Sequence, residues 1–145
     1  MSVFFSRQCE YAIQSVIYIA LKRNGELTTV KEVAGKLNIP FHFTGKIFQH
    51  LSHKDVLTST KGVSGGYALA KHADEITLLD IVVAIDGIDF HTKCLLGFPN
   101  CGGDTPCAAH DKWSVLKEEL YQLLVSKNLT QLASDMKKPG YQFPL

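Results

Sequence analysis

Residues 57–69 read LTSTKGVSGGYAL, two short segments of alternating side chains joined by a glycine-rich centre. Alternation with a period of two, interrupted by clustered glycines, predicts a β-hairpin. Lys61 adds a positive charge at the tip of this hairpin. A cationic hairpin can contact phosphates or enter a minor groove of DNA, so its significance depends on the segments that precede it.

Three helical patterns precede the hairpin. The first has an apolar stripe over residues 9–20 and is expected to end near Gly25, and the second begins where Thr29 and Glu32 have the spacing of a capping box. The third follows Pro40. Its apolar face comprises Phe43, Ile47, Phe48 and Leu51. Two short helices followed by a hairpin are typical of a winged helix-turn-helix, whose second helix lies in the major groove.

Two further helices are expected after the hairpin. One runs from its N-cap Thr77 to Gly87, and a long apolar stripe indicates a helix over residues 111–126. The predicted fold class is mainly α with a small β-hairpin, a winged helix-turn-helix plus a long C-terminal helix. We divide the chain into a DNA-binding domain (1–88), a cysteine loop (89–110), a long-helix region (111–136) and a flexible tail (137–145).

The composition of the 145 residues agrees with one compact domain and a DNA partner. Residues 1–72 contain nine lysines and arginines against four acidic residues, a balance of +5, whereas the remaining residues have a balance of −4. A basic half joined to an acidic half suits a DNA-binding face beside a regulatory face. Neither a membrane span nor a signal peptide is visible, so we expect a cytoplasmic protein without membrane contact.

The cysteine loop contains Cys94, Cys101 and Cys107, with His110 three residues after the last cysteine. In a reducing compartment such clustering favours metal or redox chemistry over structural disulfides. A structural zinc ion is the simpler candidate, but the usual Cys-x-x-Cys pair is missing. An iron–sulfur cluster tolerates the looser spacing. The isolated Cys9 lies on an apolar stripe and is expected in the core.

Three segments together resemble the Rrf2 family of winged-helix regulators, which includes iron–sulfur and nitric-oxide regulators. They are Glu10–Ile13 (EYAI), Lys61–Ala70 (KGVSGGYALA), and Ile76–Ile81 (ITLLDI) followed by Asp86-Gly87. The resemblance covers about residues 3–125. It implies a homodimer in which the long C-terminal helix crosses its partner, which makes residues 111–136 a dimerisation helix region.

The resemblance also implies which residues read DNA. The third helix becomes the recognition helix and the hairpin becomes the wing. On the recognition helix we expect base contacts from His42, Phe43, Thr44 and Lys46. Phe43 has the alternative of belonging to the core. On the wing we expect phosphate contacts from Lys61, Ser64, Gly65 and Gly66. Arginine is usual in the family where this chain has Lys61, and lysine keeps the phosphate contact while losing bidentate geometry.

By the same resemblance, Cys94, Cys101 and Cys107 hold a 2Fe–2S or 4Fe–4S cluster. The fourth ligand is His110, our preferred candidate, or Glu10, which in some relatives reaches across from the other subunit. One departure is the spacing, because six residues separate Cys94 from Cys101 where the best-known cluster-binding members have five.

We therefore predict a sequence-specific, DNA-binding transcriptional regulator. Its affinity for a double-stranded DNA operator is expected to follow an iron–sulfur cluster or the thiol redox state of the cysteine loop. The alternative is a cluster-free regulator or interaction protein with a zinc or disulfide clip in that loop. The sequence has no phosphate-binding glycine loop, no Cys-x-x-Cys redox pair and no recognisable pair of catalytic carboxylates, so an enzyme is not expected.

Overall fold

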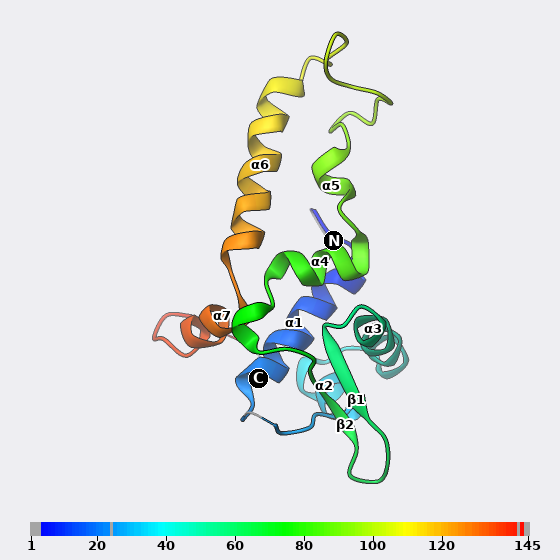
Figure 1. The fold of residues 1–145 in the computed structure, drawn as a ribbon, viewed down its shortest axis with the longest axis vertical. Coiled ribbons are helices and arrows are strands. Elements are labelled where there is room, and N and C mark those ends of the chain that lie inside the picture. Colours follow the sequence, from blue (N-terminus) through cyan, green and yellow to red (C-terminus); the bar gives the residue numbers. More distant parts are fainter. Residues whose placement is uncertain (1–3, 24, 142, 144–145) are drawn as a thin grey trace.

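The structure, a computed structural model, describes residues 4–23, 25–141 and 143. It is mainly helical with a two-stranded antiparallel hairpin, as predicted (Figure 1). In chain order the elements are α1 (Arg7–Leu21), α2 (Val30–Leu37), α3 (Phe41–His53), β1 (Leu57–Thr60), β2 (Gly66–Leu69), the 3-10 turn η1 (Ala73–Glu75), α4 (Leu78–Asp86), α5 (Asp89–Thr92), α6 (His110–Ser126) and α7 (Leu129–Met136).

Side-chain caps explain where several helices begin. The Ser6 hydroxyl accepts the Cys9 amide at α1, and Thr77 and Asp80 form a reciprocal capping box at α4. At α2 the Thr29 hydroxyl accepts the Glu32 amide, but the Glu32 carboxylate does not return to the cap. It accepts hydrogen bonds from Tyr18 and Lys22 of α1 instead, so a tertiary contact replaces half of the expected box.

The winged helix-turn-helix is built around one apolar core. Its largest fully buried side chains include Phe48, Leu51, Leu57, Ile76, Ile81 and Leu129. In the hairpin, Leu57 pairs with Leu69 and Thr60 with Gly66. The ring of Tyr67 in β2 packs edge-on against Phe48 of α3, with 5.0 Å between ring centroids. This contact packs the hairpin against α3.

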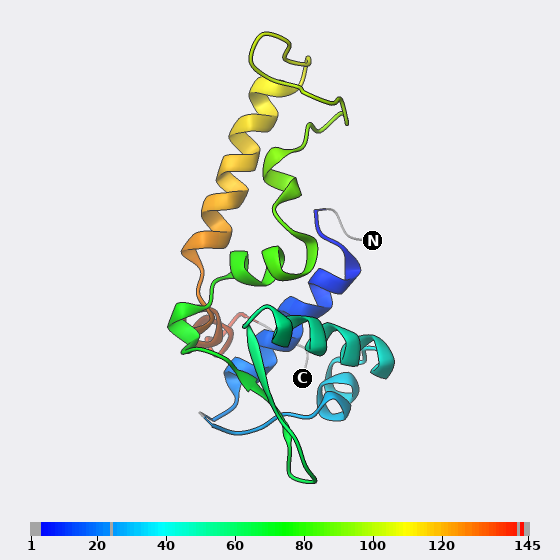
Figure 2. The ribbon, with the colours of Figure 1, turned by 45° about the vertical axis from the view of Figure 1, so that its right-hand side comes forward.

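A second, smaller core joins α1 and α4 to α6. Cys9 of α1, Val82 of α4 and Leu124 of α6 are buried together. The expectation that Cys9 belongs to the core is confirmed, and burial raises the pKa of its thiol to about 12. From this core, α5 and α6 run side by side away from the body and carry the cysteine loop at their far end, whereas the wing points the opposite way (Figures 1 and 2).

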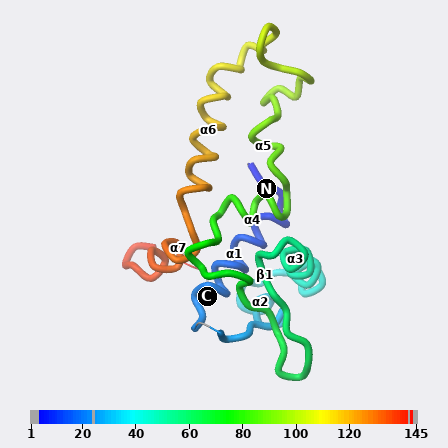
Figure 3. Tube along the Cα trace, viewed as in Figure 1, coloured from blue at the N-terminus to red at the C-terminus, as the bar shows by residue number. Residues whose placement is uncertain are grey.

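The chain turns back after α6. An isolated bridge pairs Asn128 with Thr77, and α7 then packs against α1 and η1 with Leu129 fully buried (Figure 3). Residues 111–136 therefore contain two helices, the second of which packs back on α1 and η1. Within the predicted tail, Phe143 packs against the main core, while residues 142, 144 and 145 lie outside the described residues. Over the described residues, no helix has the length and apolarity to cross a bilayer.

Candidate metal centre and nucleic-acid interface

The cysteine loop folds back on itself so that its three thiols meet. The Sγ atoms of Cys94, Cys101 and Cys107 all lie within 4.8 Å of one another, and those of Cys94 and Cys107 are 3.5 Å apart. The Cys107 amide donates to the Cys101 sulfur at 3.3 Å. The structure thus brings together the three cysteines that the sequence singled out, although 13 positions separate the first from the last.

The imidazole of His110 lies beside this group, at the start of α6. Its Nδ1 is 3.4 Å from Cys101 Sγ. A Cβ atom added at Gly102, where φ is +131°, would lie 3.2 Å from His110 Cε1, so glycine at this position lets the loop backbone approach the ring. Glu10, the other candidate ligand, lies in the first turn of α1 and outside the thiol group of its own chain. That Glu10 reaches across a dimer to act as the fourth ligand of the partner's centre stays a prediction.

The backbone around Cys94 favours its thiolate. Partial desolvation opposes ionisation, but hydrogen bonds from the amides of Phe98 and Leu96, together with the neighbouring thiols, lower the pKa of Cys94 to about 7. At Cys107, desolvation and the two neighbouring sulfurs raise the pKa, and the Ala109 amide offsets this only in part. One thiol of the group is therefore prepared to ionise near neutral pH, as a metal ligand must.

The donor set fits a thiophilic metal. Around a tetrahedral zinc ion with Zn–S bonds of about 2.3 Å, sulfur ligands lie roughly 3.8 Å apart. The 3.5 Å between the sulfurs of Cys94 and Cys107 is close to this value, and all three sulfurs lie within 4.8 Å of one another. Thiolates with an imidazole are also ligands of iron–sulfur centres. Three sulfurs and one nitrogen can thus hold either kind of group.

Two contacts from α6 position this loop, and sequence reasoning missed both. The indole Nε1 of Trp113 donates to the carbonyl of Lys93, the residue before Cys94, at 2.9 Å. The imidazole of His91 lies 3.2 Å from a Glu118 carboxylate oxygen and packs on Tyr121. Spacing predicted Trp113 only as part of an apolar stripe, because a single indole donor leaves no periodic signal.

The outer face of α3 forms the candidate nucleic-acid interface. His42 and Lys46 are exposed, as predicted for base contacts. Phe43 is half-buried, packs on the main core and meets Tyr11 edge-on at 5.7 Å, so its alternative as a core residue is the one observed. Thr44 is fully buried and its hydroxyl donates to the Pro40 carbonyl at 2.9 Å. The prediction that Thr44 contacts a base is therefore wrong.

The wing exposes Lys61 and Ser64, as expected for phosphate contacts. The amide of Gly65 already donates to the Gly62 carbonyl at 3.0 Å within the turn, so it is not a free phosphate donor and that prediction is wrong. A Cβ atom at Gly66 would lie 3.0 Å from the Thr28 carbonyl oxygen. The two glycines are thus explained by the close packing of the hairpin.

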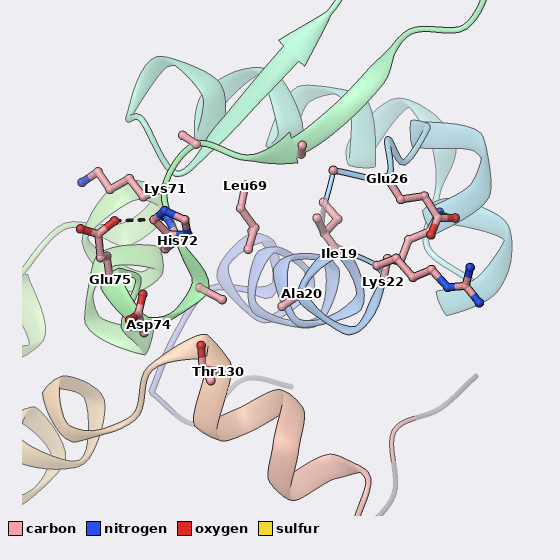
Figure 4. Close-up of a pocket in the computed structure, with 15 residues that line it drawn as sticks. Ile19, Ala20, Lys22, Glu26, Leu69, Lys71, His72, Asp74, Glu75 and Thr130 are labelled. Atoms are coloured by element: carbon pink, nitrogen blue, oxygen red, sulfur yellow. Dashed lines mark hydrogen bonds and ion pairs between the residues drawn. The ribbon is translucent and has the colours of Figure 1, made fainter.

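A groove of about 750 Å³ lies on another face, between the end of α1, β2, η1 and the start of α7 (Figure 4). Its charged groups are mixed in sign. Lys22 is paired with Glu26 and Glu32, and the His72 amide donates to Glu75. The groove contains none of the predicted site residues.

Comparison with known proteins agrees with a winged helix carrying a cysteine loop. The model of the Rrf2 family, described as an iron-dependent transcriptional regulator, matches residues 5–135. The chain belongs to the Rrf2 family. It is a transcriptional regulator of that family, and the resemblance found in the sequence is confirmed.

Other members of the Rrf2 family match most of the chain. A protein of Aquifex aeolicus, provisionally described as an HTH-type transcriptional regulator, is 33% identical over 145 residues and covers 99% of both chains. The HTH-type transcriptional regulator IscR of Photorhabdus laumondii is 25% identical over 127 residues, which cover 88% of this chain and 77% of IscR. These relatives are regulators of transcription and not enzymes.

Solved structures of Rrf2-type regulators share the fold. The structure of CymR, the global cysteine regulator of B. subtilis, matches with a TM-score of 0.77 and 24% identity, covering 92% of this chain and 98% of CymR. The structure of T. potens IscR matches with a TM-score of 0.74 and 18% identity, covering 94% of this chain and 89% of the IscR chain. At these identities the likeness concerns the fold alone.

Proposed function

We propose that this Rrf2-family protein binds a specific DNA operator as a homodimer, and that its operator affinity follows the state of a metal centre held by Cys94, Cys101 and Cys107. The observation that carries this proposal is the gathering of the three sulfur atoms within 4.8 Å at the end of an extension of the winged helix. From a role on DNA we also infer a cytoplasmic location.

We infer that the resident group is an iron–sulfur cluster with His110 as its fourth ligand. The family is described as iron-dependent, the Cys-x-x-Cys pair of common zinc sites is missing, and His110 Nδ1 lies 3.4 Å from Cys101 Sγ. When bound, a cluster would supply a redox-active iron centre. The second candidate is one zinc ion, which the 3.5 Å separation of Cys94 and Cys107 favours.

Contacts of α4, the helix from which the extension begins, with α3 and with the start of α1 support a coupling of the extension to the recognition helix. The C-terminal end of α4, which leads into α5, accepts a hydrogen bond from His50 of α3 at the carbonyl of Ala84, 2.7 Å away. Asp86 at the same end accepts the backbone amide of Ser6 at 2.7 Å. A change in the direction of α5 and α6 would therefore act on α4, and through it on α3 and α1.

The exposed surface of α6 supports dimerisation. Val115, Leu116 and Leu123 are between 50% and 57% exposed in the single chain. Large apolar side chains on one helix are usual where a second copy covers them. A dimer would place two recognition helices for two half-sites, with base contacts from His42 and Lys46 and phosphate contacts from Lys61 and Ser64.

The test is metal analysis joined to DNA binding. Protein purified without oxygen is examined by absorption spectroscopy, native mass spectrometry and assays for iron, sulfide and zinc. Operator affinity is then measured before and after removal of the metal. Cys101→Ala should lose both the metal and the metal-dependent change in affinity. Cys9→Ala alters a cysteine outside the centre and should retain both. Zinc without sulfide would favour the second candidate, and a Cys101→Ala protein that responds like wild type would refute the proposal.

A further inference from the structure

Gly45 is an unusual residue for the interior of α3. Glycine is disfavoured inside helices because it has more conformational freedom to lose than any other residue. The protein itself does not require it, since a Cβ atom added at Gly45 would meet only Val30 Cγ1 at 4.0 Å, an ordinary van der Waals contact. The packing of α3 against its neighbours therefore does not explain why this position holds glycine and not a larger residue.

The residues one turn away from Gly45 lie on the outer side of α3. Phe41 and Gln49, four residues before and after it, are both exposed, and His42 lies three residues before it. Phe41 is 52% exposed and its ring packs edge-on against His42, with 5.5 Å between centroids. The exposed Phe41 thus lies one turn before Gly45 on the same helix, and an added Cβ atom at Gly45 would approach Val30 Cγ1 of α2 at 4.0 Å. Gly45 leaves an open space beside Val30. We call it the Gly45 gap.

We propose that the Gly45 gap receives the C5-methyl group of a thymine in the major groove, with Phe41 as its specificity-determining contact. This inference rests on the proposed function, in which α3 reads the operator. The C5-methyl of thymine is the apolar group that base pairs present in the major groove, and phenylalanine is among the side chains that contact it. The neighbouring His42 and Lys46 carry polar groups for other base edges.

This assignment also gives the exposed phenylalanine a role. At the first position of α3, Phe41 packs edge-on against His42 and has half of its surface in solvent. Phe43, two residues later, is held by Tyr11 and the core. Of these two aromatic residues, Phe41 is the one left free to approach DNA.

The experiment replaces thymine by deoxyuridine, which lacks only the methyl group. The full-length wild-type protein, in the metal state that binds DNA, first selects duplexes from a random pool. The selected duplex is then resynthesised with deoxyuridine at each thymine in turn, and affinities are measured by fluorescence anisotropy. One position in each half-site should lose about fourfold in affinity, the change expected for one buried methyl group.

Two variants assign that methyl group to the gap. Phe41→Ala should bind the thymine and deoxyuridine duplexes equally. Gly45→Ala should melt at a higher temperature than wild type, because alanine favours the helix, and yet bind the deoxyuridine duplex at least as tightly as the thymine duplex, because the new methyl occupies the gap. Gly35→Ala is the matched control: Gly35 lies inside α2 with nothing within 4 Å of an added Cβ atom. It should stabilise the protein and keep the wild-type preference for thymine.

Three results would overturn the inference. They are a wild-type protein that binds every deoxyuridine duplex as well as its thymine counterpart, a Phe41→Ala protein that keeps the wild-type preference, and a Gly45→Ala protein that keeps it. Failure of the wild-type protein to select any duplex is a different outcome. It would refute the proposed operator binding, and the inference with it.

Discussion

Replacing Trp113 by phenylalanine should weaken metal binding at the cysteine loop without unfolding the protein. An aromatic ring would remain on α6, and the change would remove the hydrogen bond from Nε1 to the Lys93 carbonyl, 2.9 Å long, together with part of the apolar surface of the indole. Because both groups are partly in contact with water, the bond contributes about 0.5–1 kcal/mol, at the lower end for neutral hydrogen bonds. If that energy holds Cys94 in place for the metal, affinity falls about two- to fivefold.

The assay is a competition for Zn²⁺ between the reduced protein and a chromophoric chelator, in oxygen-free buffer. Tyr121→Phe is the control, since it alters an aromatic residue of the same helix and leaves the bond from Trp113 to Lys93 intact. Circular dichroism should show equal helix content in all three proteins. A Trp113→Phe protein that binds Zn²⁺ as tightly as wild type would show that α6 does not prepare the loop for metal.

Three further predictions concern the DNA-binding surface, the fold and the dimer. Lys61→Ala should weaken binding to all duplexes alike, because we propose that this exposed wing lysine contacts a phosphate. The slope of log affinity against log salt concentration should become shallower by about one, and an unchanged slope in salt titrations would contradict this. Thr77→Ala removes the cap of α4 and should lower the free energy of unfolding in urea by about 1 kcal/mol, whereas an unaltered midpoint would exclude a role for the capping box. Leu116→Glu combined with Leu123→Glu should give a folded monomer in light scattering, since both side chains are at least half exposed; a dimer that survives would place the interface elsewhere.

Local patterns in the sequence were enough to predict the winged helix. Alternation around the glycines of residues 57–69 gave the hairpin, and the caps at Thr29 and Thr77 marked two helix starts that the structure confirms. The same reasoning failed where a tertiary contact competes with a local one. Glu32 has the spacing of a capping box, yet its carboxylate binds Tyr18 and Lys22 on another helix.

Polarity also misled the prediction for α3. Thr44 looks like a surface residue by type, but it lies on the buried face with its hydroxyl satisfied by Pro40, a bond that no spacing rule reveals. Phe41, which the prediction passed over, is the exposed aromatic residue. The end of α6 at Ser126 agrees with the predicted helix over residues 111–126, but α7 was missed, although Asn128 and Gln131 have the local spacing of a capping box. The bridge from Asn128 to Thr77, which depends on the fold of the whole domain, left no such signal.

For the cysteine loop, the sequence predicted which thiols come together and left open what they hold. The Gly and Pro residues between Cys94 and Cys107 allow the chain to turn, and the structure confirms the meeting of the three sulfurs. As ligands, thiolates suit both a zinc ion and a cluster, whereas the 3.5 Å between the sulfurs of Cys94 and Cys107 is close to the spacing around one zinc ion.

The decisive measurement is the affinity of one protein preparation for its selected operator, with the metal present and after its removal by a chelator under oxygen-free conditions. We expect iron and sulfide in the intact preparation. Removal of the metal should change the operator affinity tenfold or more, which corresponds to about 1.4 kcal/mol or more. The Cys101→Ala protein should show no such change. Equal affinity of the metal-loaded and metal-free wild-type protein would contradict control of DNA binding by the cysteine centre.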